Sequence, residues 1–292
     1  MIVVTGATGQ LGGLIVRSLL ASSSTPQSVG VSVRDPGKAG ELTKLGVRVR
    51  KGEFGDQSSL LHAFEGASQV LLVSSNGRRE GHDAVAQHAT AINAAVQAGV
   101  KRIVYTSHMG AHKDSRFPPM ADHVETEKLL RSSGIAWTAL RNGFYAESAV
   151  DLIRDSFESG IVSLPLDGKV SWTAHKDLAE AAAAILLDDG KFEGPTPPLT
   201  GVAALDLADL AALYGDISGK SMSRHVVSDE SFEESLVRSH VPKSVIPVVM
   251  GLYKASRAGE FAAVDPTLAA LLKRPPTSMR EVLASASKTG LA

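Results

Sequence analysis

The first twelve residues, M-I-V-V-T-G-A-T-G-Q-L-G at positions 1–12, decide the fold of the chain. Residues 1–5 are apolar and mostly β-branched, which is typical of a buried strand in a parallel sheet. Glycine recurs at every third position over 6–12, and apolar residues recur at helical spacing over 11–19. The stretch therefore predicts a strand, a glycine-rich turn and a helix in immediate succession.

Each of the three glycines in this turn has its own role. Gly6 permits the tight turn, Gly9 lets the backbone approach a pyrophosphate, and Gly12 lets the helix pack closely on the sheet. Free N–H groups at the start of the helix, with the positive end of its dipole, attract phosphate. A tight structural turn without a ligand is the alternative. The motif predicts dinucleotide contacts for Gly6, Ala7, Thr8, Gly9, Gln10 and Leu11.

The composition limits the classes of protein to which the chain can belong. Its 292 residues suffice for one large domain, with or without a smaller appendage. The formal net charge of −1 gives no general attraction to nucleic acid or to an anionic membrane. The sequence has no cysteine for disulfides or thiolate ligands, and its histidines lack metal-ligand spacing. Without a secretion signal or an apolar run of about 18 residues, we expect a cytoplasmic protein with no metal site.

Strand and helix signals alternate along the first half of the chain. Apolar runs that end in polar residues are separated by amphipathic segments, which is typical of open parallel sheets. We therefore predict an α/β fold, a Rossmann-type doubly wound parallel sheet with a smaller, mostly helical C-terminal lobe. The dinucleotide-binding domain is expected over 1–158, with 172–190 packing on it, and the substrate-binding lobe over 159–292. Further strands are expected at 28–33, 47–51, 69–74, 101–106 and 135–140.

Arg34 follows the second predicted strand, at the position that sets the cofactor preference of a Rossmann fold. An acidic residue there accepts a hydrogen bond from the ribose 2′-OH of NAD, whereas an arginine suits the 2′-phosphate of NADP. Arg34 favours NADP(H), and Lys38 adds positive charge one turn further on. Asp35 leaves the NAD alternative open, and a solvated charge at the strand end is the remaining interpretation of Arg34.

Other polar residues follow predicted strands at their carboxyl ends. This edge faces the ligand in open parallel sheets. Ser74, Ser75 and Asn76 are expected to line the cofactor channel. Asn142 and Gly143 are expected to contact the cofactor, because they follow a later strand at the same edge.

Six motifs occur together along the chain and carry a family resemblance. They are T-G-A-T-G-Q-L-G at 5–12, Arg34, Gly55-Asp56, Tyr105-Thr106-Ser107, Glu125-Thr126-Glu127-Lys128 and Leu140-Arg141-Asn142-Gly143. Together they resemble the NmrA-like branch of the atypical short-chain dehydrogenases/reductases, over nearly the whole chain and most strongly over 1–147. The resemblance implies a Rossmann domain with a small C-terminal lobe, NADPH binding with Leu140 and Arg141 in the cofactor site, and two-electron reduction of a quinone. It also implies that Lys169 and Thr173 close over the cofactor from the second lobe.

Ordinary short-chain dehydrogenases use a Tyr-x-x-x-Lys pair, which this sequence lacks. The residues four positions after Tyr105, Tyr145, Tyr214 and Tyr253 are Met109, Ala149, Ser218 and Arg257. Reduction of an isolated ketone needs such an acid, because the alkoxide formed is strongly basic. The phenolate formed from a quinone is delocalised and takes a proton from water. The lack of the pair is therefore compatible with quinone reduction, and equally with binding without turnover.

Two further candidates keep alternative interpretations. Tyr145 stacks either on the nicotinamide or quinone ring or within the core. Lys128 either holds ribose hydroxyls or forms a solvated i,i+3 pair with Glu125.

We therefore predict an NADPH-dependent quinone oxidoreductase without flavin or metal, with Lys128, Asn142 and Tyr145 as catalytic residues. The first alternative is an NADP(H)-sensing regulator that binds the dinucleotide without turnover, as some members of the branch do. The second is a reductase of another unsaturated substrate, or an epimerase-like enzyme. No direct contact with nucleic acid or membrane is expected, and the sequence leaves a homodimer open.

Overall fold

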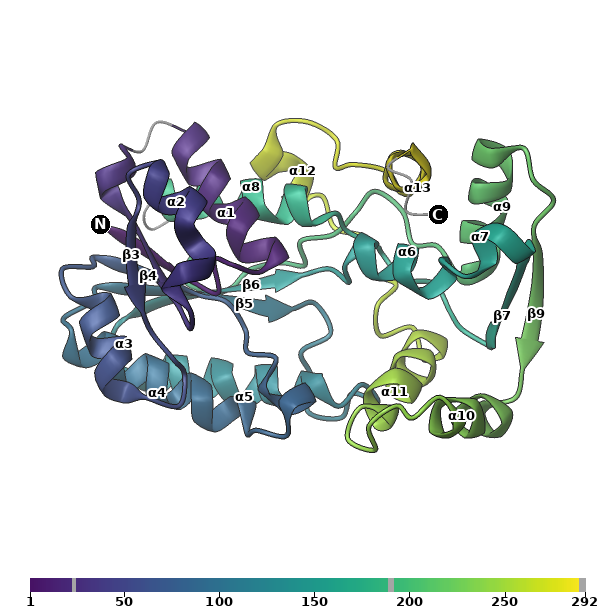
Figure 1. Cartoon of the computed structure of the whole chain (residues 1–292), viewed down its shortest axis with the longest axis horizontal. Coiled ribbons are helices and arrows are strands. Elements are labelled where there is room, and N and C mark those ends of the chain that lie inside the picture. The colour runs from purple at the N-terminus through teal and green to yellow at the C-terminus, as the bar shows by residue number, and fades with distance from the viewer. Residues whose placement is uncertain (23–24, 189–191, 289–292) are drawn as a thin grey trace. The chain divides into compact units, whose positions relative to one another are not determined.

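The computed structural model describes residues 1–22, 25–188 and 192–288 (Figure 1). The last residues of the predicted segment 172–190 and of the predicted lobe 159–292 lie outside these ranges. None of the helices within these ranges combines the length and the apolar composition that a membrane span needs. The chain forms two compact units, each with its own apolar core. The first unit comprises residues 1–108, 122–141 and 175–197, and the second comprises residues 109–121, 142–174 and 198–292.

A sheet lies at the centre of the first unit, with its strands in the order β3-β2-β1-β4-β5-β6-β8. β1 pairs in parallel with β2 on one side and with β4 on the other, so the strand order reverses between β1 and β4. Ligands of such sheets bind outside the carboxyl ends of the strands at this reversal. The predicted Rossmann-type α/β fold is confirmed. The strands are β1 Ile2–Thr5, β2 Val29–Val33, β3 Arg48–Lys51, β4 Gln69–Leu72, β5 Arg102–His108, β6 Ala136–Asn142 and β8 Gly194–Pro195.

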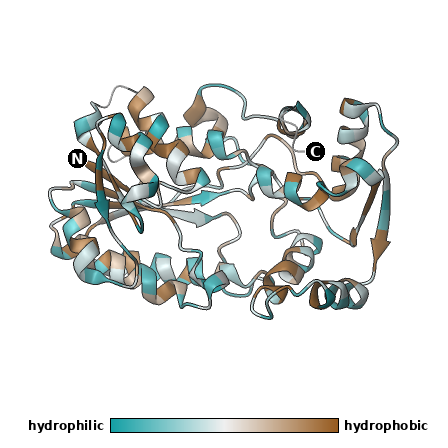
Figure 2. Ribbon diagram, viewed as in Figure 1, coloured by the Kyte–Doolittle hydropathy of each residue, from teal (hydrophilic) through white to brown (hydrophobic). Residues whose placement is uncertain are grey.

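Helices cover both faces of this sheet. α1 and α8 pack together on one face, and α3 and α4 pack together on the other (Figure 1). Hydrophilic and hydrophobic residues are mixed along these helices (Figure 2), because only one side of each helix packs on the sheet. The helices of the first unit are α1 Gln10–Ala21, α2 Gly40–Lys44, α3 Gln57–Phe64, α4 Ala84–Gln97, α5 Pro119–Ser132 (from Asp122) and α8 His175–Leu187, with 3-10 turns η1 Pro26–Ser28, η2 Pro36–Ala39 and η3 Gly77–Glu80.

The second unit is mostly helical. Its strands β7 Ile161–Pro165 and β9 Ser223–Val227 pair in parallel. α13 packs on α6 and α9, and Phe157 stacks on Tyr214 with the ring centroids 3.9 Å apart. Its helices are α6 Ala146–Ile153, α7 Ser156–Ser159, α9 Leu207–Ser218, α10 Asp229–Arg238, α11 Ile246–Arg257, α12 Thr267–Leu272 and α13 Met279–Lys288.

The division between the units differs from the predicted boundary at residue 158. Residues 109–121 and 142–158 were expected in the first domain but belong to the second unit. The reason is long-range packing, since Phe117 and Met120 share an apolar core with Phe261. Two strands end later than predicted, and β4 ends at Leu72, two residues before the expected end. β5 continues to His108 and β6 to Asn142, two residues beyond the expected ends of these strands.

Candidate functional site

The glycine loop between β1 and α1 is closed tightly. Gly6 has a φ of 61°, in the left-handed region that favours glycine, and its N–H donates to the Ser32 carbonyl at 3.2 Å. A Cβ atom on Gly12 would lie 2.3 Å from the carbonyl oxygen of Gly6. The start of α1 therefore lies directly against the end of β1, and only glycine fits at position 12.

Helix α1 begins without a side-chain cap. Gly9 is its N-cap residue and makes no side-chain hydrogen bond, and the first turn contains no acidic residue. Helices α3 and α4 also follow strands of this sheet, but Asp56 and Asp83 cap their first N–H groups with a carboxylate. The positive end of the α1 dipole thus stays open to an anionic ligand.

Arg34 directly follows β2 and forms an ion pair with Glu80 of η3. Its Nη1 lies 3.1 Å from Oε2 of Glu80, and the two side chains are 70% and 45% exposed. Asp35 has a local role, because its carboxylate accepts a hydrogen bond from the Gly37 N–H at 3.0 Å at the start of η2. The arginine expected to contact a 2′-phosphate is therefore reachable from solvent, while the neighbouring acid is engaged in a turn.

The segment after β4 is held by side chains from neighbouring elements. The Ser74 N–H donates to Oγ1 of Thr106, and the Ser75 N–H donates to Nε2 of His88, each at 2.8 Å. The Ser75 hydroxyl donates to the side chain of Gln87. These contacts fix the backbone of 74–76 next to the end of β1, since β4 and β1 are neighbours in the sheet.

His88 is a supporting residue that the sequence did not reveal. It is buried in α4, and its Nδ1 lies 2.8 Å from Oγ1 of Thr126 in α5. Burial lowers the pKa of His88 to about 4, so the ring is neutral near neutral pH. Because Nε2 accepts from Ser75, Nδ1 carries the proton and donates to Thr126. One histidine in an alanine-rich helix gave no signal, because both partners lie far from it along the chain.

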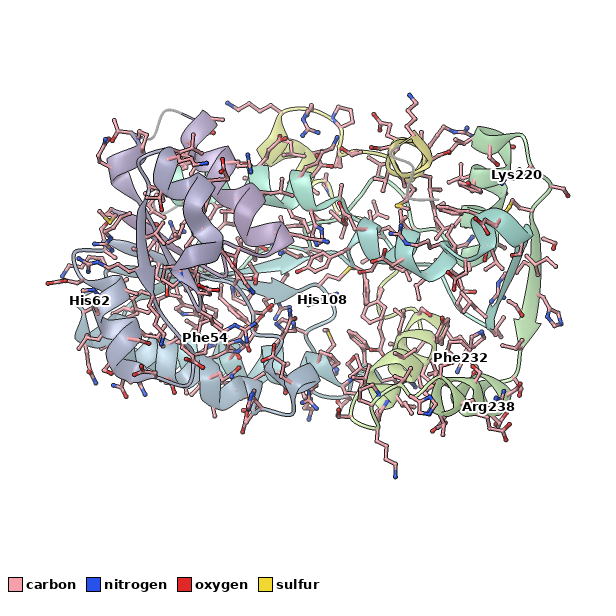
Figure 3. The ribbon with its side chains drawn as sticks, viewed as in Figure 1. Phe54, His62, His108, Lys220, Phe232 and Arg238 are labelled. Carbon is pink, nitrogen blue, oxygen red and sulfur yellow. The ribbon has the colours of Figure 1, made fainter. Side chains whose placement is uncertain are left out.

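Tyr105 contacts a histidine rather than a lysine. Its hydroxyl lies 2.8 Å from Nδ1 of His123 in α5, and its ring is fully buried in the sheet core. Burial, together with the nearby His88, lowers the pKa of His123 to about 3. Burial also lowers the pKa of His108, at the end of β5 (Figure 3), to about 3. Neither ring is an imidazolium at neutral pH, so neither is a ready proton donor of that kind.

Arg141 has a structural partner. Its Nη2 lies 2.8 Å from Oε2 of the buried Glu127, and Glu127 also accepts from the Ser107 hydroxyl at 2.7 Å. These bonds join β5, α5 and β6 at the carboxyl edge of the sheet. The neighbouring predicted residue Leu140 is fully buried in β6.

Both predicted lysines also pair with carboxylates. Lys128 Nζ lies 2.7 Å from Oε1 of Glu125 on an exposed face of α5, which matches the second interpretation of this residue. In the second unit, Lys169 Nζ lies 2.8 Å from Oδ2 of Asp206 and also contacts Asp209. These two aspartates form the capping box of α9, and their hydrogen bonds raise the pKa of Lys169. Each lysine therefore has a role in the fold that does not depend on a ligand.

Gly143 and Thr173 of the second unit lie in direct contact. A Cβ atom on Gly143 would lie 2.2 Å from Oγ1 of Thr173. Thr173 is fully buried, and its hydroxyl donates to the Ser171 carbonyl at 3.0 Å and accepts from the Gly201 N–H at 2.9 Å. Glycine is required at position 143 because this threonine fills the space beside it.

Asn142 and Tyr145 form a polar pair beside them. Asn142 is only 2% exposed, and its Oδ1 has no hydrogen-bond partner within the described part of the chain. Burial raises the pKa of Tyr145 to about 12, although its hydrogen bond with Asn142 opposes the increase. Tyr145 is therefore a neutral phenol, and Asn142 holds a buried acceptor that a ligand group can satisfy.

The structure brings the predicted residues together in two sets. In the first unit, the glycine loop, Arg34 and 74–76 follow the carboxyl ends of β1, β2 and β4, which are adjacent in the sheet. The second set lies in the second unit and consists of Asn142, Gly143, Tyr145 and Thr173. The backbones of Tyr145 and Thr173 form an isolated parallel β-bridge. Lys128 and Lys169 are engaged in ion pairs of their own.

Comparison with known proteins shows the family to which the chain belongs. The model of the NmrA-like family matches residues 1–281. The chain is 36% identical over 285 residues to quinone oxidoreductase 2 of Escherichia coli (strain K12), with 96% of each chain covered. The crystal structure of an NADPH-dependent quinone oxidoreductase from Escherichia coli, complexed with NADPH, has a TM-score of 0.91 at 33% identity, covering 99% of this chain and 100% of that one. A triphenylmethane reductase from Citrobacter sp., complexed with NADP(H), has a TM-score of 0.89 at 33% identity, covering 98% and 100%.

Proposed function

The chain belongs to the NmrA-like family, and we propose that it is an NADPH-dependent oxidoreductase that reduces a quinone by two electrons. The family resemblance read from the sequence is confirmed. The relatives described above are named as quinone oxidoreductases or as a triphenylmethane reductase, and two were crystallised with NADPH or NADP(H). The observation that carries the proposal is the start of α1, which follows a tight glycine loop and has no capping side chain. The preceding strand β1 pairs with β2, and Arg34 directly follows β2.

The chemistry of the described residues fits NADPH. The N–H groups at the start of α1 suit the pyrophosphate, and the guanidinium of Arg34 suits the phosphate on the adenosine ribose. The backbone of 74–76 follows the strand next to β1. The unpartnered Oδ1 of Asn142, at the end of β6, is an acceptor for an amide or hydroxyl group of a ligand.

The side chains are suited to positioning and water exclusion rather than to acid catalysis. NADPH, when bound, supplies a hydride to the acceptor. His108 and His123 are neutral at physiological pH, and burial raises the pKa of the Tyr145 phenol to about 12. A quinone is an acceptor that matches this site, since its reduced anion is weakly basic and takes a proton from water.

The individual roles of the predicted residues stay proposals. Asn142 and Tyr145 would position the reacting groups, because both are polar and Asn142 is buried. Contact of Lys128 with ribose would require it to leave Glu125, and closure of Lys169 over the cofactor would require it to leave the capping box of α9. The cytoplasmic location and a homodimer also stay predictions.

The test is oxidation of NADPH by the purified protein with a simple benzoquinone, in the presence of a chelator and without added flavin. Turnover under these conditions supports the proposal. Tight binding of NADPH without reduction of any quinone would instead favour the regulator that senses NADP(H). Failure to bind either NADPH or NADH would overturn both functions, since both depend on the same glycine loop.

A further inference from the structure

The short turn η3 is attached to the rest of the first unit by two ion pairs at the carboxyl edge of the sheet. Arg78 donates through Nε and Nη2 to the two carboxylate oxygens of Asp122, at 2.8 and 2.6 Å. Two residues later, Glu80 accepts from Nη1 of Arg34 at 3.1 Å. η3 thus connects the end of β2 with the start of the α5 segment in this unit.

The two ion pairs differ in geometry and exposure. The Arg78–Asp122 pair is bidentate, and the side chain of Asp122 is only 17% exposed. The Arg34–Glu80 pair uses a single nitrogen of the guanidinium, and both side chains are largely open to solvent. Bidentate pairs fix geometry, whereas exposed single contacts contribute little to stability. Glu80 can therefore leave Arg34 while Arg78 keeps η3 in place.

We propose that Glu80 is a specificity-determining residue that competes with the 2′-phosphate of NADPH for Arg34. This inference rests on the proposed function. A phosphate dianion that binds Arg34 must displace the Glu80 carboxylate or accept its charge as a neighbour, and either outcome weakens binding. NADH has no 2′-phosphate and leaves the pair intact. Glu80 therefore narrows the preference for NADPH that Arg34 alone would give.

Asp35 does not have this effect, although it is adjacent to Arg34 in the sequence. Its carboxylate accepts from the Gly37 N–H and caps η2, so it keeps that partner whether or not a phosphate binds. Glu80 has no such backbone partner among its hydrogen bonds to described residues, which are both to Arg34.

The experiment measures dissociation constants of NADPH and NADH by fluorescence titration for the full chain and its variants. Glu80→Gln should lower the dissociation constant of NADPH about two- to fivefold, which is the range expected for an exposed charge pair. It should leave the dissociation constant of NADH unchanged. Glu65→Gln is the matched control. Glu65 lies at the end of α3 and forms an ion pair with Arg50, so the variant removes the same charge from a different pair. It should leave both constants unchanged.

The Arg34→Ala background separates competition from a general charge effect. If Glu80 acts through Arg34, Glu80→Gln should change NADPH binding much less in Arg34→Ala than in the natural chain. Equal changes for NADPH and NADH, or weaker NADPH binding in Glu80→Gln, would overturn the inference while leaving the proposed function intact. If the natural chain binds neither nucleotide, the proposed function itself is wrong.

Discussion

Helices α1 and α4 each follow a strand of the same sheet, but their first turns are built differently. α1 begins at Gly9, with no side chain on its first N–H groups. α4 begins at Asp83, whose carboxylate accepts from the N–H groups of Val85 and Ala86. A carboxylate cap stabilises a helix by about 1 kcal/mol. The chain uses this stabilisation at α4 and does without it at α1.

The difference shows that one helix start in this fold is built for stability and another is left free for a ligand. A helix start closed by an aspartate has its donors satisfied and repels an anion. An open start carries unsatisfied donors, which a phosphate can satisfy. α4 contributes to the site indirectly, because its His88 holds the backbone of Ser75.

The largest expected effect comes from giving α1 the kind of start that α4 has. Gly9 has φ −86° and ψ 170°, an extended conformation open to any residue. A Cβ atom at position 9 would lie 3.3 Å from the Gly6 carbonyl oxygen, and the new cap on α1 should offset this close contact in urea unfolding of Gly9→Asp. Gly9→Asp should weaken the binding of both NADPH and NADH about a hundredfold by repulsion of the pyrophosphate. Gly9→Asn is the control, since it has nearly the same size and no charge. Equal losses of nucleotide binding in the two variants would mean that the size of the side chain, and not its charge, weakens binding.

The next effect concerns the contact between α4 and the segment after β4. Because burial lowers the pKa of His88 to about 4, the unfolded chain binds a proton at this residue between about pH 6.5 and 4 and the folded chain does not. Stability should therefore fall as pH falls through this range, with a contribution from His88 of about 2 kcal/mol at pH 5. Urea unfolding at pH 7.5 and 5 measures the change.

The variant His88→Gln isolates this contribution. Burial also lowers the pKa values of His108 and His123, and both residues remain in the two proteins. The difference between the two proteins therefore reports His88 together with its electrostatic effect on His123. The loss of stability between pH 7.5 and 5 should be smaller in His88→Gln. An equal loss in both proteins would show that this histidine is not held neutral.

A smaller effect is expected at Arg34, which would bind the 2′-phosphate of NADPH, whereas the start of α1 would bind the pyrophosphate. Arg34→Ala should weaken the binding of NADPH about tenfold and the binding of NADH less than twofold, because only NADPH carries the 2′-phosphate. The same titrations measure both constants. Similar losses for the two nucleotides would assign Arg34 to another part of the cofactor.

The smallest effect should follow removal of the cap on α4. Asp83→Ala should lower the free energy of unfolding by about 1 kcal/mol and change the binding of either nucleotide less than twofold. Together with Gly9→Asp, it tests whether the two helix starts have separate functions. A large loss of NADPH binding in Asp83→Ala would remove the distinction between them.

Much of the fold followed from local patterns. The strand, glycine turn and helix over the first residues could be predicted, because each depends on neighbours within about four positions. The doubly wound parallel sheet then followed from the alternation of strands and helices. The boundary between the units could not be predicted, because Phe117 packs with Phe261, far along the chain.

The candidate site was predictable to different degrees at different residues. Gly6 and Gly12 were identified from spacing, because a close backbone approach needs glycine whatever surrounds it. Lys169 was expected at the cofactor, and nothing in its sequence neighbourhood revealed Asp206 as its partner. His88 was missed for the same reason.

The sequence by itself determined the glycine loop and the helix start without a capping side chain, since both are properties of consecutive residues. The tertiary structure alone decided which charges are already neutralised. Glu80 reaches Arg34 and Glu127 reaches Arg141 only after strands and helices have been placed side by side. Charge pairing depends on distances in space, and sequence separation does not fix those distances.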